Sequence, residues 1–171
     1  MPGYSKPDDA ILIALGSNLP GQFKAPQDNL FACLGVLSDL GLNITVVSRM
    51  WRSTAWPNPD DPEYINAVAI VECDMNVLAL LSVLQDVEVR FGRTRQGINA
   101  PRTVDLDLIA YGRVCLTDAT LTLPHPRAHE RGFVMGPLCD ILPDWRHPVT
   151  GLTAEAHYRT VSVGTDARPI G

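Results

Sequence analysis

Two leucine-rich helical stripes, each set between runs of β-forming residues, limit the possible folds of this chain more than any other feature. The stripes cover residues 26–40 and 77–91, where apolar side chains recur at helical spacing, and Gly41 and Gly92 follow them. Four short runs typical of strands surround the helices, at residues 11–15, 44–53, 64–73 and 104–111. The predicted order of elements is therefore β-α-β-β-α-β.

This order is typical of the ferredoxin-like arrangement, in which helices pack on an antiparallel sheet. We therefore expect an α+β fold with a ferredoxin-like core. A short strand at residues 121–123 and a helix at 133–141 would add C-terminal elements to that core. Because many unrelated functions use such folds, the fold class alone predicts no activity.

Length and composition indicate one globular unit, since the chain has 171 residues and 46% of them are hydrophobic. We expect a single domain over residues 1–171, with 1–10 and about 150–171 at its periphery. No run approaches the ~18 apolar residues of a membrane-spanning helix, and the N-terminus does not resemble a signal peptide. We therefore expect a cytoplasmic monomer that has no membrane partner. The four cysteines are too widely spaced to predict a zinc cage or a disulfide framework.

Arginine is concentrated in residues 90–131, although the chain as a whole has a net charge of −5. This segment holds seven of the fourteen basic residues and only four acidic ones, so its own charge is +3 and the remainder carries −8. All seven are arginines, which form bidentate contacts with phosphate groups. Binding along a nucleic-acid backbone needs a broader basic surface, so we expect no nucleic-acid partner and instead a compact polyphosphate.

Asp105 and Asp107 form the strongest local signal of a functional site, because they alternate with Leu106 and Leu108 in the strand predicted at residues 104–111. Side chains two residues apart in a strand share a face, so at ~3.3 Å per residue these carboxylates would lie about 6.6 Å apart. Two such carboxylates can hold a pair of hard cations, and Mg²⁺ typically combines one or two carboxylates with substrate phosphate oxygens. A solvated acidic face is the alternative interpretation, and the nearby arginines favour the metal site.

Three other side chains suit a flat heterocyclic ligand. Tyr64 and Phe133 could stack on a ring, and Asn66 could read its hydrogen-bonding edge. Tyr64 and Asn66 lie two residues apart in a predicted strand and therefore share a face. His125 is a candidate phosphate contact, with plain surface exposure as the alternative.

The end of the second predicted helix carries an acid, and the segment that follows it carries several arginines. Glu88 lies on the apolar stripe of its helix and needs a partner there, so we expect a structural ion pair with Arg93 or Arg102. Residues 93–103 have no periodicity and are predicted to form a mobile loop. Arg93 and Arg95 could close over phosphates from such a loop and exclude water.

Five short motifs occur in one order between Ile11 and about Trp145. The most specific consists of Gly92-Arg93-x-Arg95 and Pro101-Arg102-Thr103-Val104-Asp105-Leu106-Asp107. The others are Leu15-Gly16-Ser17-Asn18, Tyr64-Ile65-Asn66-Ala67, Leu123-Pro124-His125 and Arg131-Gly132-Phe133. Together they resemble the motifs of the 6-hydroxymethyl-7,8-dihydropterin pyrophosphokinase family of folate biosynthesis.

The resemblance implies a transfer of the pyrophosphoryl group of ATP to a hydroxymethyl-dihydropterin, which leaves AMP. It implies two Mg²⁺ ions that bridge the triphosphate and are held by Asp105 and Asp107. It assigns catalytic contacts with the phosphates to three arginines, Arg93, Arg95 and Arg102. It assigns contacts with ATP to Thr122, His125 and Arg131. It places around the pterin Tyr64 and Phe133 as stacking rings, with Asn66, Ser53 and Trp56 at the edges.

Two other classes of function remain open at this point. One is a metal-dependent phosphohydrolase, in which water replaces the pterin as the nucleophile at the site of Asp105 and Asp107. The other is a non-catalytic nucleotide- or RNA-binding module with a ferredoxin-like fold. The arginines around the two aspartates favour the transferase over the module, because positioning and electrostatics provide most of the catalysis in such transfers.

Overall fold

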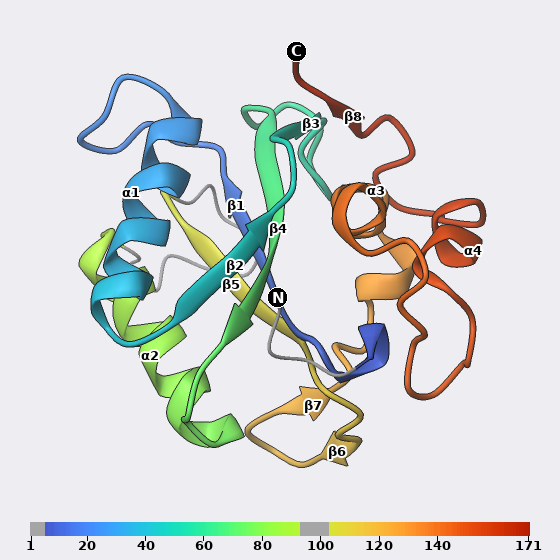
Figure 1. Ribbon diagram of the computed structural model, residues 1–171. Helices are drawn as coiled ribbons and strands as arrows, with labels where there is room; N and C mark the ends of the chain where they lie inside the picture. Colours follow the sequence, from blue (N-terminus) through green and yellow to red (C-terminus); the bar gives the residue numbers. More distant parts are fainter. Residues whose placement is uncertain (1–5, 93–102) are drawn as a thin grey trace.

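The computed structural model describes residues 6–92 and 103–171, and it confirms the predicted α+β fold (Figure 1). Its helices are η1 (Pro7–Asp9), α1 (Pro26–Asp39), α2 (Val77–Arg90), η2 (Ala128–Glu130), α3 (Gly132–Ile141) and α4 (Ala154–Tyr158). Its strands are β1 (Ile11–Ser17), β2 (Asn43–Val47), β3 (Trp51–Ser53), β4 (Tyr64–Glu72), β5 (Asp105–Tyr111), β6 (Leu116–Thr117), β7 (Thr122–Leu123) and β8 (Arg168–Pro169).

The main sheet has six antiparallel strands in the order β5-β1-β4-β3-β8, and β2 pairs with another part of β4. The four strands of the predicted core correspond to β1, to β2 together with β3, to β4 and to β5. The ferredoxin-like arrangement is therefore confirmed. The short strands β6 and β7 pair in a separate two-stranded sheet. Figure 1 shows this hairpin at one end of the main sheet, away from β3 and β8.

Each face of the sheet carries its own hydrophobic core because side chains alternate along the strands. In β1, Ile13 and Leu15 belong to the core under α1 and α2, whereas Leu12 and Ala14 belong to the core under α3. Figure 1 shows α1 and α2 on one side of the sheet and α3 with α4 on the other. Among the described residues, no helix is long and apolar enough to cross a membrane.

The single strand predicted at residues 44–53 is wrong, because the structure divides it into β2 and β3. Both strands pair with β4, and a register shift between Ile44 and Val46 precedes the break. Ser48 lies in the interruption, where its hydroxyl accepts a hydrogen bond from Val68 N at 3.0 Å and donates one to Arg49 O at 2.8 Å. The side chain therefore supplies a bond that a regular ladder would take from the backbone.

Helix α3 continues without a break through Gly136 and Pro137, which lie within the helix predicted at residues 133–141. Gly136 lets the helix lie directly against Trp51, since a Cβ on Gly136 would fall 2.5 Å from Trp51 Cζ3. Asp140 fixes this contact, since its carboxylate accepts hydrogen bonds from Trp51 Nε1 at 2.8 Å and from Arg49 Nη2 at 2.7 Å. The close approach sets the position of α3 over the sheet.

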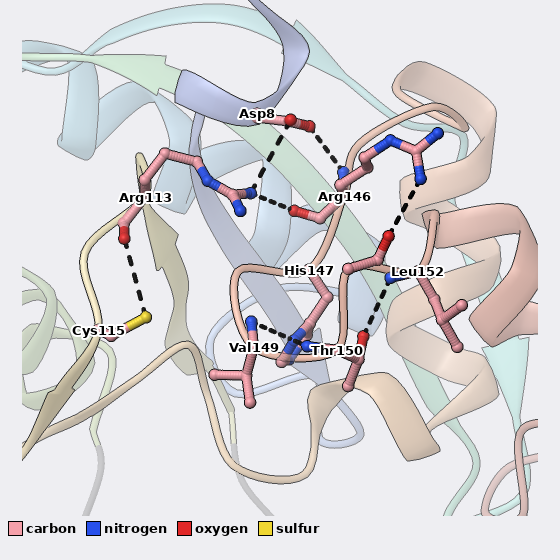
Figure 2. Close-up of polar contacts among 9 residues, drawn as sticks. Asp8, Arg113, Cys115, Arg146, His147, Val149, Thr150 and Leu152 are labelled. Atoms are coloured by element: carbon pink, nitrogen blue, oxygen red, sulfur yellow. Dashed lines mark hydrogen bonds and ion pairs between the residues drawn. The ribbon is translucent and has the colours of Figure 1, made fainter.

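The residues just before β1 are joined to the loop after α3 by specific polar contacts (Figure 2). Asp8 accepts a hydrogen bond from Arg146 N at 2.8 Å, and Arg113 Nη1 donates one to Arg146 O at 2.7 Å. Helix α4 and strand β8, which the sequence pattern did not reveal, lie in the last eighteen residues. The division into one domain with peripheral ends stays a prediction, although β8 near the C-terminus pairs with β3 of the main sheet.

Candidate active site

A row of residues crosses four strands at one end of the sheet. Asp105 of β5 is paired with Gly16 of β1, Gly16 with Asn66 of β4, and Asn66 with Trp51 of β3. Directly paired residues point to the same face, which here is the face covered by α3. Because Gly16 has no side chain, a space is left between the carboxylate of Asp105 and the amide of Asn66. A Cβ on Gly16 would fall 3.4 Å from Asn66 Oδ1.

This hollow is a pocket that collects most of the residues predicted for the site. Its lining residues are Ala14, Leu15, Gly16, Ser53, Thr54, Trp56, Tyr64, Asn66, Asp105, Asp107, Arg131, Phe133 and Val134. These residues come from β1, β4 and β5, from the end of β3 and the loop after it, and from the start of α3 and the residue before it. Five lining residues were not predicted for the site. Thr54 and Val134 directly follow the predicted residues Ser53 and Phe133, and the other three are Ala14, Leu15 and Gly16 of β1.

The two aspartates point into the pocket for the reason predicted from their alternation. Leu106 and Leu108 are buried in the core under α1 and α2, so Asp105 and Asp107 are left on the opposite face, where both are half-buried. Asp107 is paired with Ala14 and Asp105 with Gly16, and these small neighbours leave the carboxylates open to the pocket.

Arg131 brings a positive charge to the rim between two aromatic rings. Its Cζ lies 5.9 Å from the centre of the Trp56 ring and 5.7 Å from that of Phe133, which are cation–π distances. Arg131 immediately precedes α3, and Phe133 is in its first turn. The start of α3 therefore supplies both a guanidinium and a ring to the same wall of the pocket.

The opposite part of the pocket is held by a buried polar pair. Asn66 Nδ2 donates a hydrogen bond to Ser53 Oγ at 2.9 Å, and the two residues are 6% and 1% exposed. This bond holds the Asn66 side chain against the end of β3. Tyr64, two residues before Asn66 in β4, lines the pocket on the same face.

A second hollow contains Thr122 and His125, the two remaining predicted site residues that the structure describes. Thr122 and His125 line it together with the β6–β7 hairpin and the loop at residues 147–150. Its volume of about 400 Å³ falls within the roughly 300–1,000 Å³ of small-molecule sites. His125 lies close enough to Arg131 and Asp105 of the first pocket for their charges to affect its pKa.

His125 is neutral at neutral pH. Burial, with the positive charges of Arg131 and Arg127, lowers its pKa to about 4, and the charge of Asp105 opposes this only in part. Its Nδ1 accepts a hydrogen bond from Arg127 N at 3.2 Å, which leaves the proton on Nε2. The imidazole is therefore a neutral hydrogen-bond donor and not a cation.

Glu88 is buried in the core and contacts the strand that carries the aspartates. It is 2% exposed, and its Oε2 accepts a hydrogen bond from Leu106 N at 3.1 Å. Burial and, secondly, the charge of Glu88 raise the pKa of the nearby Cys33 to about 12. The predicted ion pair involves Arg93 or Arg102, which lie outside the described residues, as do Arg95 and the predicted mobile loop.

Replacing Glu88 with alanine should lower the free energy of unfolding by about 1–3 kcal/mol, because the amide of Leu106 would be buried without this acceptor. Glu88→Gln retains an acceptor oxygen and should keep most of that stability. Urea unfolding of the two variants and the unmodified chain measures the difference. A glutamine variant as unstable as the alanine variant would contradict the backbone role and favour the predicted ion pair.

The fold and the pocket together define an α+β domain whose site combines carboxylates, a guanidinium and aromatic rings. A family model described as 7,8-dihydro-6-hydroxymethylpterin-pyrophosphokinase (HPPK) matches residues 12–143. The chain therefore belongs to this family.

Curated relatives agree with this assignment. A 2-amino-4-hydroxy-6-hydroxymethyldihydropteridine pyrophosphokinase of Haemophilus influenzae is 37% identical over 144 residues, which cover 84% of this chain and 88% of the relative. A protein of the same name from Synechocystis is 39% identical over 136 residues, which cover 79% and 69%. The folic acid synthesis protein fol1 of Pneumocystis carinii is 35% identical over 95% of this chain, which spans only 21% of that protein's length.

Solved structures support the fold. The wild-type HPPK-DHPS of Plasmodium falciparum superimposes with a TM-score of 0.72 at 11% identity, over 94% of this chain and 44% of that one. A crystal structure of HPPK-DHPS in complex with substrates gives a TM-score of 0.70 at 10% identity, and the match covers 94% of this chain and 46% of that chain. At these identities the likeness concerns the fold alone.

Proposed function

We propose that this chain transfers the pyrophosphoryl group of ATP to 6-hydroxymethyl-7,8-dihydropterin, giving the pterin diphosphate and AMP. Membership of the family supports this reaction. Its main structural support is that one pocket unites two carboxylates with a guanidinium, aromatic rings and an amide. The phosphohydrolase and the binding module that the sequence left open are not favoured by the relatives.

The pocket divides between the two substrates according to its chemistry. Tyr64 and Phe133 are proposed to stack on the pterin, and Asn66, held by Ser53, to read its edge. Trp56 lines the same end. The triphosphate would lie near the carboxylates and Arg131, with the rest of ATP directed towards the second hollow.

The carboxylates fit a magnesium site that the nucleotide completes. Asp105 and Asp107 provide oxygen ligands of the kind that Mg²⁺ prefers. Among the residues that the structure describes, no group of three or more His, Cys, Asp or Glu side chains could hold a metal ion, so phosphate oxygens would have to supply further ligands. Two Mg²⁺ ions bound there would neutralise charge on the triphosphate during transfer.

The protein's own part in the reaction is orientation and electrostatic stabilisation. The pterin would be held so that its hydroxymethyl oxygen faces the β-phosphorus, which converts an encounter of two substrates into a step within one complex. Arg131 is proposed to stabilise negative charge on the transferring group, and Nε2–H of His125 to donate a hydrogen bond to ATP. Arg93, Arg95 and Arg102 are proposed to act on the phosphates as well.

The reaction is tested by incubating the chain with ATP and Mg²⁺, with and without 6-hydroxymethyl-7,8-dihydropterin, and measuring AMP. AMP is expected only with the pterin and in equal amount to the pterin diphosphate. Equal AMP formation without the pterin would favour the hydrolase, and formation of ADP would contradict pyrophosphoryl transfer. Omitting Mg²⁺ and adding a chelator tests the proposed metal.

Replacing His125 with alanine should raise KM for ATP about 2- to 12-fold, the effect of one lost hydrogen bond. His125→Gln should keep most of the affinity, since glutamine is a neutral donor of similar reach. Because the pKa of His125 lies near 4, KM for ATP should show no ionisation of this residue between pH 5.5 and 8. A step in that range that disappears in His125→Gln would show that the charged form binds ATP.

A further inference from the structure

The pocket has two walls that come from distant parts of the chain. One wall is the end of β3, with Ser53 and Thr54, and the other is the start of α3, with Arg131 and Phe133. A flat ligand that stacks on Phe133 and contacts the end of β3 requires a defined separation of these walls. The segment at residues 162–170 contacts both of them.

This segment is bonded to the start of α3. Ser162 N and Val163 N donate hydrogen bonds to Glu130 O at 3.0 and 3.1 Å, and Gly132 N donates one to Val163 O at 2.7 Å. Gly164 then packs on the ring of Phe133, where an added Cβ would overlap Cδ1, and its φ of +66° also favours glycine. The segment therefore supports the stacking ring from behind.

The same segment is bonded to the end of β3 by one carboxylate. Asp166 Oδ2 accepts hydrogen bonds from Thr54 N at 2.8 Å and from Thr54 Oγ1 at 2.6 Å. Strand β8 continues the connection by pairing with β3, and Figure 1 shows the two strands side by side. These hydrogen bonds, the largest influence, lower the pKa of Asp166 despite partial burial, so the carboxylate is charged at neutral pH.

The link between the walls is very short. One residue separates Gly164 from Asp166, so their Cα atoms lie at most about 7 Å apart. A hydrogen bond from Ala167 N to Gly164 O at 3.1 Å closes this stretch into a turn. The ring of Phe133 and the backbone of Thr54 therefore both contact the same compact turn. The hydrogen bond to Thr54 N also sets the direction of the Ser53 carbonyl, because the two groups belong to one planar peptide.

We propose that Asp166 is a positioning residue for the pterin, which acts through Thr54 and sets the separation between the end of β3 and Phe133. This inference rests on the proposed function of the pocket. Asp166 itself need not touch the ligand. Without its carboxylate the end of β3 would lose its connection to the turn behind Phe133, and the site would bind the heterocycle less tightly.

The test compares Asp166→Ala with Asp166→Asn, which keeps one acceptor oxygen for Thr54, and with Asp86→Ala as a control on the exposed face of α2. The dissociation constant of the pterin is measured by calorimetry in the presence of a non-hydrolysable ATP analogue, and KM and kcat are measured separately. Asp166→Ala should weaken pterin binding about 3- to 10-fold, the range of one or two exposed hydrogen bonds. Its kcat and its KM for ATP should stay within about 2-fold.

Asp166→Asn should recover most of the pterin affinity, and Asp86→Ala should match the unmodified chain. Unchanged pterin binding in Asp166→Ala, or an equal loss of ATP and pterin affinity, would overturn the inference. Failure of the proposed function looks different, because the unmodified chain would then form no AMP and bind no pterin. An unmodified chain that makes AMP beside an unaffected Asp166→Ala variant refutes the positioning role alone.

Discussion

Asp107→Ala is expected to reduce AMP formation by at least about 10²- to 10³-fold, the loss that follows removal of one essential electrostatic group. The carboxylate faces the pocket from β5, and its paired residue on β1 is Ala14, whose methyl group cannot bind a metal ion. Asp105→Ala should have a comparable effect, since the two carboxylates are proposed to bind the same pair of cations. AMP production at saturating ATP and pterin measures both variants.

The fold should survive these substitutions, because both aspartates are half-buried on the pocket side while Leu106 and Leu108 anchor the strand. Circular dichroism and thermal unfolding check this, with Asp86→Ala on α2 as the matched control. Full activity in a folded Asp107→Ala protein would remove this residue from the proposed metal site. Full activity in both single variants would remove the site altogether.

Phe133→Ala should weaken pterin binding roughly 5- to 150-fold. Loss of a stacked ring costs about 1–3 kcal/mol in base–aromatic systems, and 1.4 kcal/mol corresponds to a factor of ten. ATP affinity should hardly change, because Arg131 also lies 5.9 Å from the Trp56 ring and retains that contact. Separate titrations of the pterin and of an ATP analogue into the folded variant measure the two affinities.

The alternative is that Phe133 serves only to fill the space between α3 and Gly164. In that case the variant would lose stability and both ligands would bind less tightly. Phe133→Leu helps to separate the two cases, since leucine fills much of the space but cannot stack. Pterin affinity that is normal in the leucine variant, or a parallel loss of both ligands in the alanine variant, would contradict stacking.

Several features of this protein follow from local sequence patterns. The leucine stripes of α1 and α2 have the helical period, and the alternation of Asp105 to Leu108 has the strand period, so which face each side chain occupies could be predicted. The order of elements then predicts the ferredoxin-like arrangement. Tyr64 and Asn66 were placed on one face for the same reason, and both line the pocket.

Other features depend on contacts between residues far apart in the chain. The pairing of Asp105 with Gly16 and of Gly16 with Asn66 is a matter of strand register, which no local period encodes. The partner of Glu88, the neutral state of His125 and the interruption at Ser48 each arise from a neighbour brought close by folding. Sequence patterns could indicate that these residues were unusual but could not identify the neighbour.

The C-terminal segment shows the difference most clearly. From sequence, residues after about 150 have a weak pattern and are predicted to be peripheral, because periodicity detects only segments that bury a face of their own. In the tertiary structure, Gly164 and Asp166 contact Phe133 and Thr54, which are more than thirty and one hundred residues away. The sequence by itself determined the two long helices and the buried faces of the strands they pack on, because local side-chain periodicity specifies these elements. The tertiary structure decided where β2 ends and β3 begins, that β8 forms, and which residues meet around the pocket, because these depend on packing between distant segments.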